Sequence, residues 1–185
     1  MNSFLDNFFH RKRFKKIIKY IPVGAVVCDI GCGEKAIFLK TVSSSIKKGI
    51  GLDAKIENCR DRNLELRKLN IEKMLPLESE SCDIITMAAV VEHLSHPREI
   101  LSECFRSLKK GGKLLITTPA PLAKPILDFL AFKLHLIDEN EIRDHKQYFR
   151  PKDLNRLLVA AGFEEKNIES SFFEFFLNSL TIAKK

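Results

Sequence analysis

The chain lacks an apolar segment long enough to span a membrane. Its longest apolar stretch, residues 122–137, is interrupted by Lys124, Asp128 and Lys133, so no uniformly apolar run of about 20 residues exists. The apolar residues near the N-terminus precede the positive charges there, and no small-residue cleavage pattern follows them, which disfavours a secretory signal peptide. These absences predict a protein that stays in the cytoplasm.

Cysteine pairs with zinc-binding spacing are absent too. The five cysteines include no CxxC pair of the kind that clamps zinc. Free thiols in a reducing compartment are the simplest interpretation, and they agree with the predicted location.

Internal repeats and low-complexity segments are also missing. A chain of 185 residues with 45% hydrophobic residues fits one compact domain and leaves little room for a second. We therefore predict a single domain over residues 1–185.

Short apolar runs alternate with segments of helical periodicity, a pattern typical of crossover units and a mainly parallel sheet. One helix is expected from Pro97 to the glycine pair Gly111 and Gly112, and another from Pro151 to Gly162. A strand is also expected within residues 170–183, in an uncertain register. The other expected strands are Ala25 to Ile30, Lys48 to Leu52, a weaker one ending near Leu69, Cys82 to Met87, and Lys113 to Thr118.

The formal net charge is +7, and much of the basicity lies in residues 1–20. Basic residues between Arg11 and Lys19 alternate there with apolar ones, which predicts an amphipathic helix with a basic face. A helix that packs on the sheet and leaves this face in solvent is the favoured interpretation. Peripheral contact with a membrane or with nucleic acid is the alternative.

The most informative segment is VVCDIGCG, from Val26 to Gly33, an apolar strand that runs into a turn. Gly31 and Gly33 leave no side chain between the backbone and a ligand. In an open α/β sheet, nucleotide-like ligands bind at the carboxyl ends of the strands. Asp53 ends the next strand about 20 residues later, where a carboxylate can accept hydrogen bonds from both ribose hydroxyls of an adenosine.

Asp29 separates two cofactors that share this pattern. The spacing of Gly31, Gly33 and Ala36 also matches the dinucleotide fingerprint, whose pyrophosphate would meet repulsion from a carboxylate just before the turn. S-adenosylmethionine instead carries a sulfonium and an ammonium group, which that carboxylate attracts. The sequence therefore favours S-adenosylmethionine, and a nicotinamide-dependent oxidoreductase is a disfavoured alternative.

The segment from Val27 to Gly33 resembles the first motif of the class I S-adenosylmethionine-dependent methyltransferases, in particular the small-molecule enzymes with a minimal domain. Gly51 to Asp53 resembles the acidic end of that family's second strand. The resemblance extends over most of the chain, through Asn70 to Leu77, Ser81 to Ile85, Val91 to Leu94, Leu108 to Gly112, and Ala161 to Phe163.

The resemblance implies a Rossmann-like three-layer α/β sandwich with a mainly parallel seven-stranded sheet whose last strand is antiparallel. It implies S-adenosylmethionine as the cofactor. Asn70 stands where the family commonly has an aspartate against adenine, but an amide oxygen can also accept from the adenine amine. The residues expected around the donor are Asp29, Gly31, Cys32, Gly33, Asp53, Ala54, Asn70, Ile71 and Ala88.

Methyl transfer depends mainly on holding donor and nucleophile at attack distance, but a hydroxyl acceptor benefits from a general base. Glu92, His93 and His145 are the candidate catalytic residues. The pair Glu92 and His93 also resembles part of a metal-binding cluster of some ubiquinone-pathway O-methyltransferases, but Ala89 replaces the glutamate that completes it. No metal site is therefore predicted.

The predicted function is methyl transfer from S-adenosylmethionine to a small-molecule acceptor, with O-methylation slightly favoured. Residues 119–150 have no counterpart in the minimal strand pattern and are a candidate substrate lid. Residues 86–89 lack the pattern of amino-methyltransferases that act on DNA bases, so a nucleic-acid acceptor is a lesser alternative. A protein of the same fold that binds the donor without turnover is a further one.

Overall fold

The structure, a computed structural model, describes residues 4–72, 74–126, 133, 147–174 and 176–185. In these ranges eight strands form one sheet in the order β3-β4-β2-β1-β5-β6-β8-β7. The strands are β1 (Val26–Ile30), β2 (Lys48–Asp53), β3 (Cys59–Asp61), β4 (Leu64–Lys68), β5 (Cys82–Ala88), β6 (Leu108–Pro119), β7 (Ile168–Phe173) and β8 (Asn178–Lys184).

The central strands β4, β2, β1, β5 and β6 are parallel to one another. At one edge β8 pairs antiparallel with both β6 and β7. This arrangement confirms the predicted fold class. The strand count differs from the expected seven because a short strand, β3, pairs antiparallel with β4 at the other edge. All of β3 is exposed and it spans only three residues, so it carries no hydrophobic alternation that the sequence could reveal.

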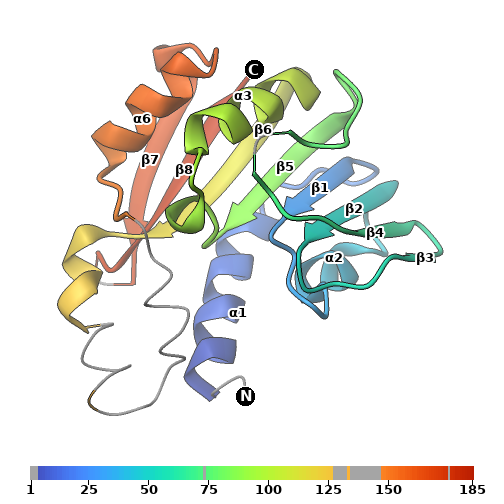
Figure 1. Ribbon diagram of the computed structural model, residues 1–185, viewed down its shortest axis with the longest axis horizontal. Helices are drawn as coiled ribbons and strands as arrows, with labels where there is room; N and C mark the ends of the chain where they lie inside the picture. Colours follow the sequence, from blue (N-terminus) through green and yellow to red (C-terminus); the bar gives the residue numbers. More distant parts are fainter. Residues whose placement is uncertain (1–3, 73, 127–132, 134–146, 175) are drawn as a thin grey trace.

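Helices cover both faces of the sheet (Figure 1). The helices α1 (Phe4–Ile18) and α2 (Ile37–Val42) lie on one face, where Ile17 and Phe38 pack with the β5 residue Ile84. The helices α3 (Pro97–Ser107) and α6 (Pro151–Ala160) lie on the other, where Leu101 and Leu154 join the second core cluster. Short 3-10 helices in the described part of the chain are η1 (Val91–His93), η2 (Pro121–Ala123) and η3 (Glu165–Asn167).

The predicted end of the α3 helix was wrong. The helix ends at Ser107 rather than at the glycine pair, because Leu108 is fully buried and pairs with Cys82 at the start of β6. The glycines instead allow a bend within β6. Gly111 has a φ of +80°, and a Cβ on Gly112 would lie 2.9 Å from the Lys109 carbonyl oxygen.

The N-terminal basic segment packs on the sheet through its apolar residues. Ile17 is fully buried, and the Phe14 ring lies 5.2 Å from the Phe38 ring of α2, centroid to centroid. Lys15 and Lys16 are exposed, and Lys16 Nζ lies 5.6 Å from the centre of the Phe173 ring. Among the described helices, none combines the length and the apolar character that crossing a membrane requires. Most of the candidate lid, residues 119–150, lies outside the described residues.

Glu65 forms ion pairs with three basic side chains at the β3–β4 edge of the sheet. Its carboxylate lies 2.9 Å from Lys48 Nζ, 2.8 Å from an Arg60 nitrogen and 2.9 Å from an Arg67 nitrogen. The hydrogen bonds from Lys48 and Arg60 lower the pKa of Glu65 from 4.5 to about 2. Glu65 therefore links β2, β3 and β4.

Glu65→Gln is expected to lower the free energy of unfolding at pH 7 by about 1 kcal/mol, because charge-assisted hydrogen bonds across three strands are lost. A carboxylate whose pKa is depressed in the folded state stabilises the fold above its unfolded pKa, and that contribution fades as the pH falls from about 4.5 towards 2. Urea titrations at pH 7 and pH 3 measure the difference. Glu57→Gln is the matched control, since Glu57 pairs only with Lys68 and its side chain is 85% exposed; equal losses in the two variants would contradict the assignment.

Candidate functional site

The turn after β1 is built from backbone conformations that glycine adopts freely. Gly31 has a φ of +72° and Gly33 a φ of +70°. The Gly31 amide donates to the Leu52 carbonyl oxygen at 2.8 Å, which ties the turn to the end of β2. The carboxyl ends of the two central strands therefore meet at this turn.

The two glycines meet different surroundings. A Cβ on Gly31 would overlap Val90 Cγ2, so the chain that leaves β5 packs directly against the glycine backbone. A Cβ on Gly33 would meet no atom within 4 Å. Gly31 is thus required for packing, whereas Gly33 faces open space that a ligand could occupy.

Asp53 is held in place by the backbone on both sides. Its Oδ2 accepts from the Gly33 amide at 2.8 Å, and its Oδ1 accepts from the Lys55 amide at 2.7 Å. A carboxylate oxygen can accept more than one hydrogen bond, so both oxygens keep capacity for a ligand hydroxyl. The orientation of Asp53 suits a vicinal diol such as that of a ribose.

Asp29 puts a second carboxyl group beside the first. Its side chain is 3% exposed and accepts from Thr86 Oγ1 at 2.5 Å. Burial, together with the charge of Asp53, raises the pKa of Asp29 to about 7, although the Thr86 hydrogen bond acts in the opposite direction. Burial and the charges of Asp29 and Asp53 also raise the pKa of Cys32 to about 12. A cationic group bound beside Asp29 would favour its ionised form, because an opposite charge lowers the pKa of a carboxyl.

The other predicted donor residues end neighbouring strands. Ala54 follows β2, Ala88 ends β5, and Asn70 and Ile71 follow β4. The Leu69 amide donates to the Asp53 carbonyl oxygen at 2.9 Å, so the segment after β4 is joined to the end of β2. The Asn70 amide nitrogen donates to Glu72 Oε1 at 2.9 Å, which leaves the Asn70 oxygen as an acceptor. The fold brings these residues to the carboxyl ends of the parallel strands.

Glu92 and His93 lie in η1, just past the carboxyl end of β5. Glu92 is fully buried, and its Oε2 accepts from Thr118 Oγ1 of β6 at 3.2 Å. Burial raises the pKa of Glu92 to about 7, while the Arg13 charge and the Thr118 hydrogen bond act in the opposite direction. A carboxyl with this pKa can exchange a proton at neutral pH. His145, the third candidate, lies outside the described residues.

Three contributors were missed from the sequence: Thr86, Thr118 and Val90. Thr86 becomes a partner of Asp29 only because β1 and β5 pair with these residues side by side. Thr118 reaches Glu92 from β6, and Val90 packs on Gly31. No local sequence signal marks them, since each contact joins segments that are far apart in the chain or depends on how the chain leaves β5.

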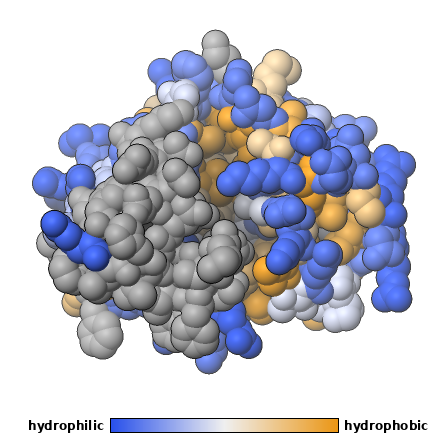
Figure 2. Space-filling model, turned by 60° about the horizontal axis from the view of Figure 1, so that its bottom comes forward, coloured by the Kyte–Doolittle hydropathy of each residue, from blue (hydrophilic) through white to orange (hydrophobic). Residues whose placement is uncertain are grey.

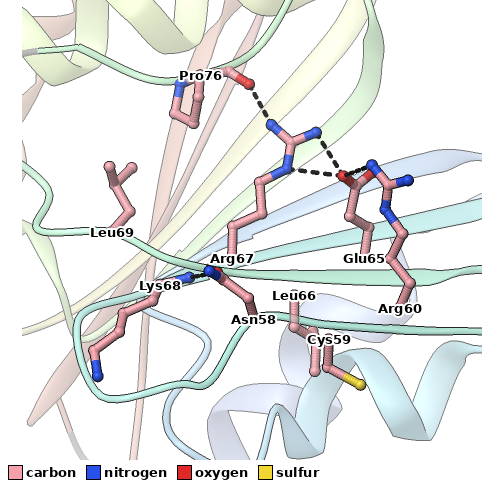
Figure 3. A pocket seen from close by; sticks show the side chains of 9 residues that line it. All are labelled: Asn58, Cys59, Arg60, Glu65, Leu66, Arg67, Lys68, Leu69 and Pro76. Carbon is pink, nitrogen blue, oxygen red and sulfur yellow. Dashed lines mark hydrogen bonds and ion pairs between the residues drawn. The ribbon is translucent and has the colours of Figure 1, made fainter.

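A cavity of about 550 Å³ lies over β3 and β4, the two strands at one lateral edge of the sheet (Figure 3). Arg60 and Arg67 converge there on Glu65, and Arg67 also donates to the Pro76 carbonyl oxygen at 2.7 Å. None of the predicted donor or catalytic residues lines this cavity. Its arginines already hydrogen-bond to protein oxygens, so we do not assign the donor to it.

Figure 2 turns the bottom of Figure 1 forward, the side on which α1 lies. Where this face is coloured, hydrophobic residues lie exposed between hydrophilic ones. An exposed apolar surface of this kind is common at ligand-binding sites.

Comparison with known proteins places the chain among methyltransferases. The family model described as methyltransferase domain matches residues 1–167. The ubiquinone biosynthesis O-methyltransferase of Psychrobacter arcticus is 25% identical over 159 residues, which cover 78% of this chain and 61% of that protein. A Mycolicibacterium smegmatis protein named "Probable S-adenosylmethionine-dependent methyltransferase" is 31% identical over 147 residues, 76% of this chain and 52% of that protein. The chain thus spans between about half and two thirds of these relatives.

Solved structures show the same fold. A methyltransferase dependent on S-adenosylmethionine from Archaeoglobus fulgidus superimposes with a TM-score of 0.71 at 21% identity, over 94% of this chain and 92% of that one. A Haloferax volcanii protein solved in complex with a methyltransferase activator gives a TM-score of 0.69 at 15% identity, over 100% of this chain and 98% of that one.

Gly31→Ala is expected to lower the free energy of unfolding by about 2–3 kcal/mol, because a left-handed alanine costs roughly 1–2 kcal/mol and overlap with Val90 adds to it. Gly33→Ala, which adds only the first cost, is the matched variant. Chemical denaturation measures both. Val90→Ala in the Gly31→Ala background should recover part of the loss, and a double variant no more stable than Gly31→Ala would contradict the packing argument.

Proposed function

The chain belongs to the S-adenosylmethionine-dependent methyltransferase family, and from that premise we propose that it methylates a hydroxyl group of a small molecule in the cytoplasm. The observation that supports binding of the methyl donor is the pair of carboxyl groups, Asp29 and Asp53, at the glycine turn. The proposal that the acceptor is a hydroxyl group rests on the buried carboxyl of Glu92.

The residues at the turn fit S-adenosylmethionine in charge and in hydrogen bonding. Asp53, oriented by two backbone amides, would accept from the ribose hydroxyls. A cation beside Asp29 and Asp53 would favour the ionised form of Asp29, so the pair suits the ammonium and sulfonium groups, whereas a pyrophosphate would be repelled by these carboxyl groups. The open space at Gly33 would take the donor against the backbone, and the free oxygen of Asn70 would accept from the adenine amine.

When bound, S-adenosylmethionine supplies a methyl group already activated by positive sulfur. The protein's own contribution is therefore to orient the acceptor and to manage its proton. A hydroxyl is a weak nucleophile until it loses that proton. Glu92, whose pKa is about 7, would take the proton at neutral pH, and Thr118 would hold the carboxyl in position.

A hydroxyl acceptor is favoured over an amine by the presence of this carboxyl. A neutral amine attacks through its lone pair and loses its proton afterwards, so it has less need of a buried base. One relative is named for O-methylation in ubiquinone biosynthesis, which agrees with this choice. His93, adjacent to Glu92 in η1, is the second candidate for the role of base.

Calorimetric titration tests the donor site. The protein is expected to bind S-adenosylmethionine and S-adenosylhomocysteine but not NAD, and Asp53→Ala should weaken both by at least about tenfold, because two hydrogen bonds to a carboxylate are lost. Asp61→Ala, which removes an exposed carboxylate of β3, is the control and should bind like the wild type. Binding of NAD alone would overturn the assignment.

Transfer of a labelled methyl group to matched phenols and anilines tests the acceptor. Glu92→Gln is expected to reduce methylation of the phenols by about 100-fold, the usual contribution of a general base, and to spare the donor affinity. Loss of donor affinity in this variant would instead indicate a structural role. Methylation of the anilines alone would contradict a hydroxyl acceptor.

A further inference from the structure

The stretch of chain between β4 and β5, residues 69–81, carries the two residues expected at the adenine, Asn70 and Ile71. We call it the β4–β5 segment. At its start the Leu69 amide donates to the Asp53 carbonyl oxygen at 2.9 Å, which attaches this end beside the expected ribose site. Asn70 and Met74 are exposed and Ile71 is half-buried, so burial alone does little to fix the residues that follow. The position of Asn70 therefore depends on how the rest of the segment is held.

Arg106, in the last turn of α3, holds the far part of the β4–β5 segment. Its guanidinium donates to the Leu77 carbonyl oxygen at 2.8 Å, to the Leu75 carbonyl oxygen at 3.4 Å and to Ser79 Oγ at 3.1 Å. A guanidinium can reach several acceptors at once because its N–H groups form a rigid planar fork. One side chain of α3 thus ties down three residues of the segment.

Glu103 orients Arg106 and adds a contact of its own. Its two carboxylate oxygens accept from Arg106 Nε and Nη2, both at 2.9 Å, the bidentate geometry that fixes a guanidinium most firmly. Its Oε2 also accepts from the Leu75 amide at 3.1 Å. The pair therefore binds both the N–H and the carbonyl group of Leu75, whose side chain is buried in the core cluster against which Ile71 packs.

Two further hydrogen bonds hold the same part of the segment. The Glu80 amide donates to the Arg106 carbonyl oxygen at 3.0 Å, which gives a partner to one of the carbonyl groups that a helix leaves unpaired at its end. Arg67 of β4 donates to the Pro76 carbonyl oxygen at 2.7 Å from the other side (Figure 3). The contacts of Arg106 and Glu103 with Leu75 are the attachment nearest to Asn70.

We propose that Arg106 is a positioning residue for the adenine of the methyl donor. Through Leu75 it attaches the β4–β5 segment on the far side of Asn70 from Leu69, so that both ends of a short span are tied and fewer conformations are open to it. The Asn70 oxygen would then stay turned towards the adenine amine. The inference deepens the proposed function and rests on its assignment of Asn70 to adenine.

Calorimetry with two nucleosides that differ only in the base tests the inference. S-adenosylhomocysteine presents an amine to the Asn70 oxygen, whereas S-inosylhomocysteine presents a carbonyl oxygen, which cannot donate. The wild type should prefer the adenine compound by about tenfold, the worth of about one hydrogen bond. Arg106→Gln should reduce this preference to about twofold or less, because the Asn70 oxygen is no longer held in place.

Two variants are the controls. Arg98→Gln removes the same charge from an exposed position of α3. Lys109→Gln breaks the ion pair with Asp83, at 2.8 Å, and so lowers stability without removing a hydrogen bond of Arg106. Both should keep the wild-type preference, and urea denaturation checks that every variant is folded during the titration. A merely structural role of Arg106 would weaken both compounds equally; an unchanged ratio in Arg106→Gln, or an equal loss of preference in Lys109→Gln, would overturn the inference.

A double variant shows whether Arg106 acts through Asn70. Asn70→Ala should abolish the preference for adenine by itself, and adding Arg106→Gln should change the ratio of the two affinities no further, because residues that act through one contact are not additive. A further fall of the ratio in the double variant would overturn the inference.

Hydrogen exchange separates this inference from the proposed function. If the wild type does not bind S-adenosylhomocysteine, or if Asn70→Ala keeps the wild-type preference, the assignment of Asn70 to adenine fails. Exchange of the Leu75 amide, which donates to Glu103, still decides whether Arg106 holds the segment. It should be about fivefold faster in Arg106→Gln than in Arg98→Gln, and equal rates would overturn that role.

Discussion

The hydrogen bond from the Gly33 amide to the Asp53 carboxylate is the interaction on which the candidate site depends. It joins the turn after β1, where Gly33 adopts a positive φ, to the end of β2. The same turn brings Asp29 close enough for the two carboxyl groups to influence each other. The fold thus disfavours the ionised form of Asp29 in the absence of a cation. S-adenosylmethionine carries two cationic groups that would favour that form.

The last turns of α3 connect the packing of the fold with the donor side of the site. Leu75 and Leu77 join the core cluster on the α3 side of the sheet, and Arg106 and Glu103 hydrogen-bond to the same stretch of chain. That stretch, the β4–β5 segment, also carries Asn70, next to the end of β2. A helix that packs on the sheet thus also takes part in placing the residue expected to meet the adenine.

The fold, and the place of the glycine turn and of Asp53 within it, could be predicted where the signal is local. The strand from Val26 and its glycine turn are contiguous in the chain, and Asp53 follows from the regular spacing of a crossover unit. The end of α3 could not be predicted, since the glycines after Ser107 resemble a helix stop while the burial of Leu108 starts a strand.

Contacts that depend on the pairing of strands could not be predicted from residues that are neighbours in the sequence. Thr86 meets Asp29 only through the pairing of β1 with β5, and β3 is too short and too exposed to show a pattern. Arg106 was one of several basic residues around the end of its helix. Only the position of α3 distinguishes it, because its acceptors on Leu75 and Leu77 lie far away in the chain.

The most direct test of the donor site is a crystal structure of the protein with S-adenosylhomocysteine. The account predicts the ribose hydroxyls on Asp53, the backbone of Gly31 to Gly33 against the ligand, and the amino group on the side of Asp29. A nucleoside bound elsewhere, for instance in the cavity over β3 and β4, with Asp53 still engaged only by backbone amides, would contradict it.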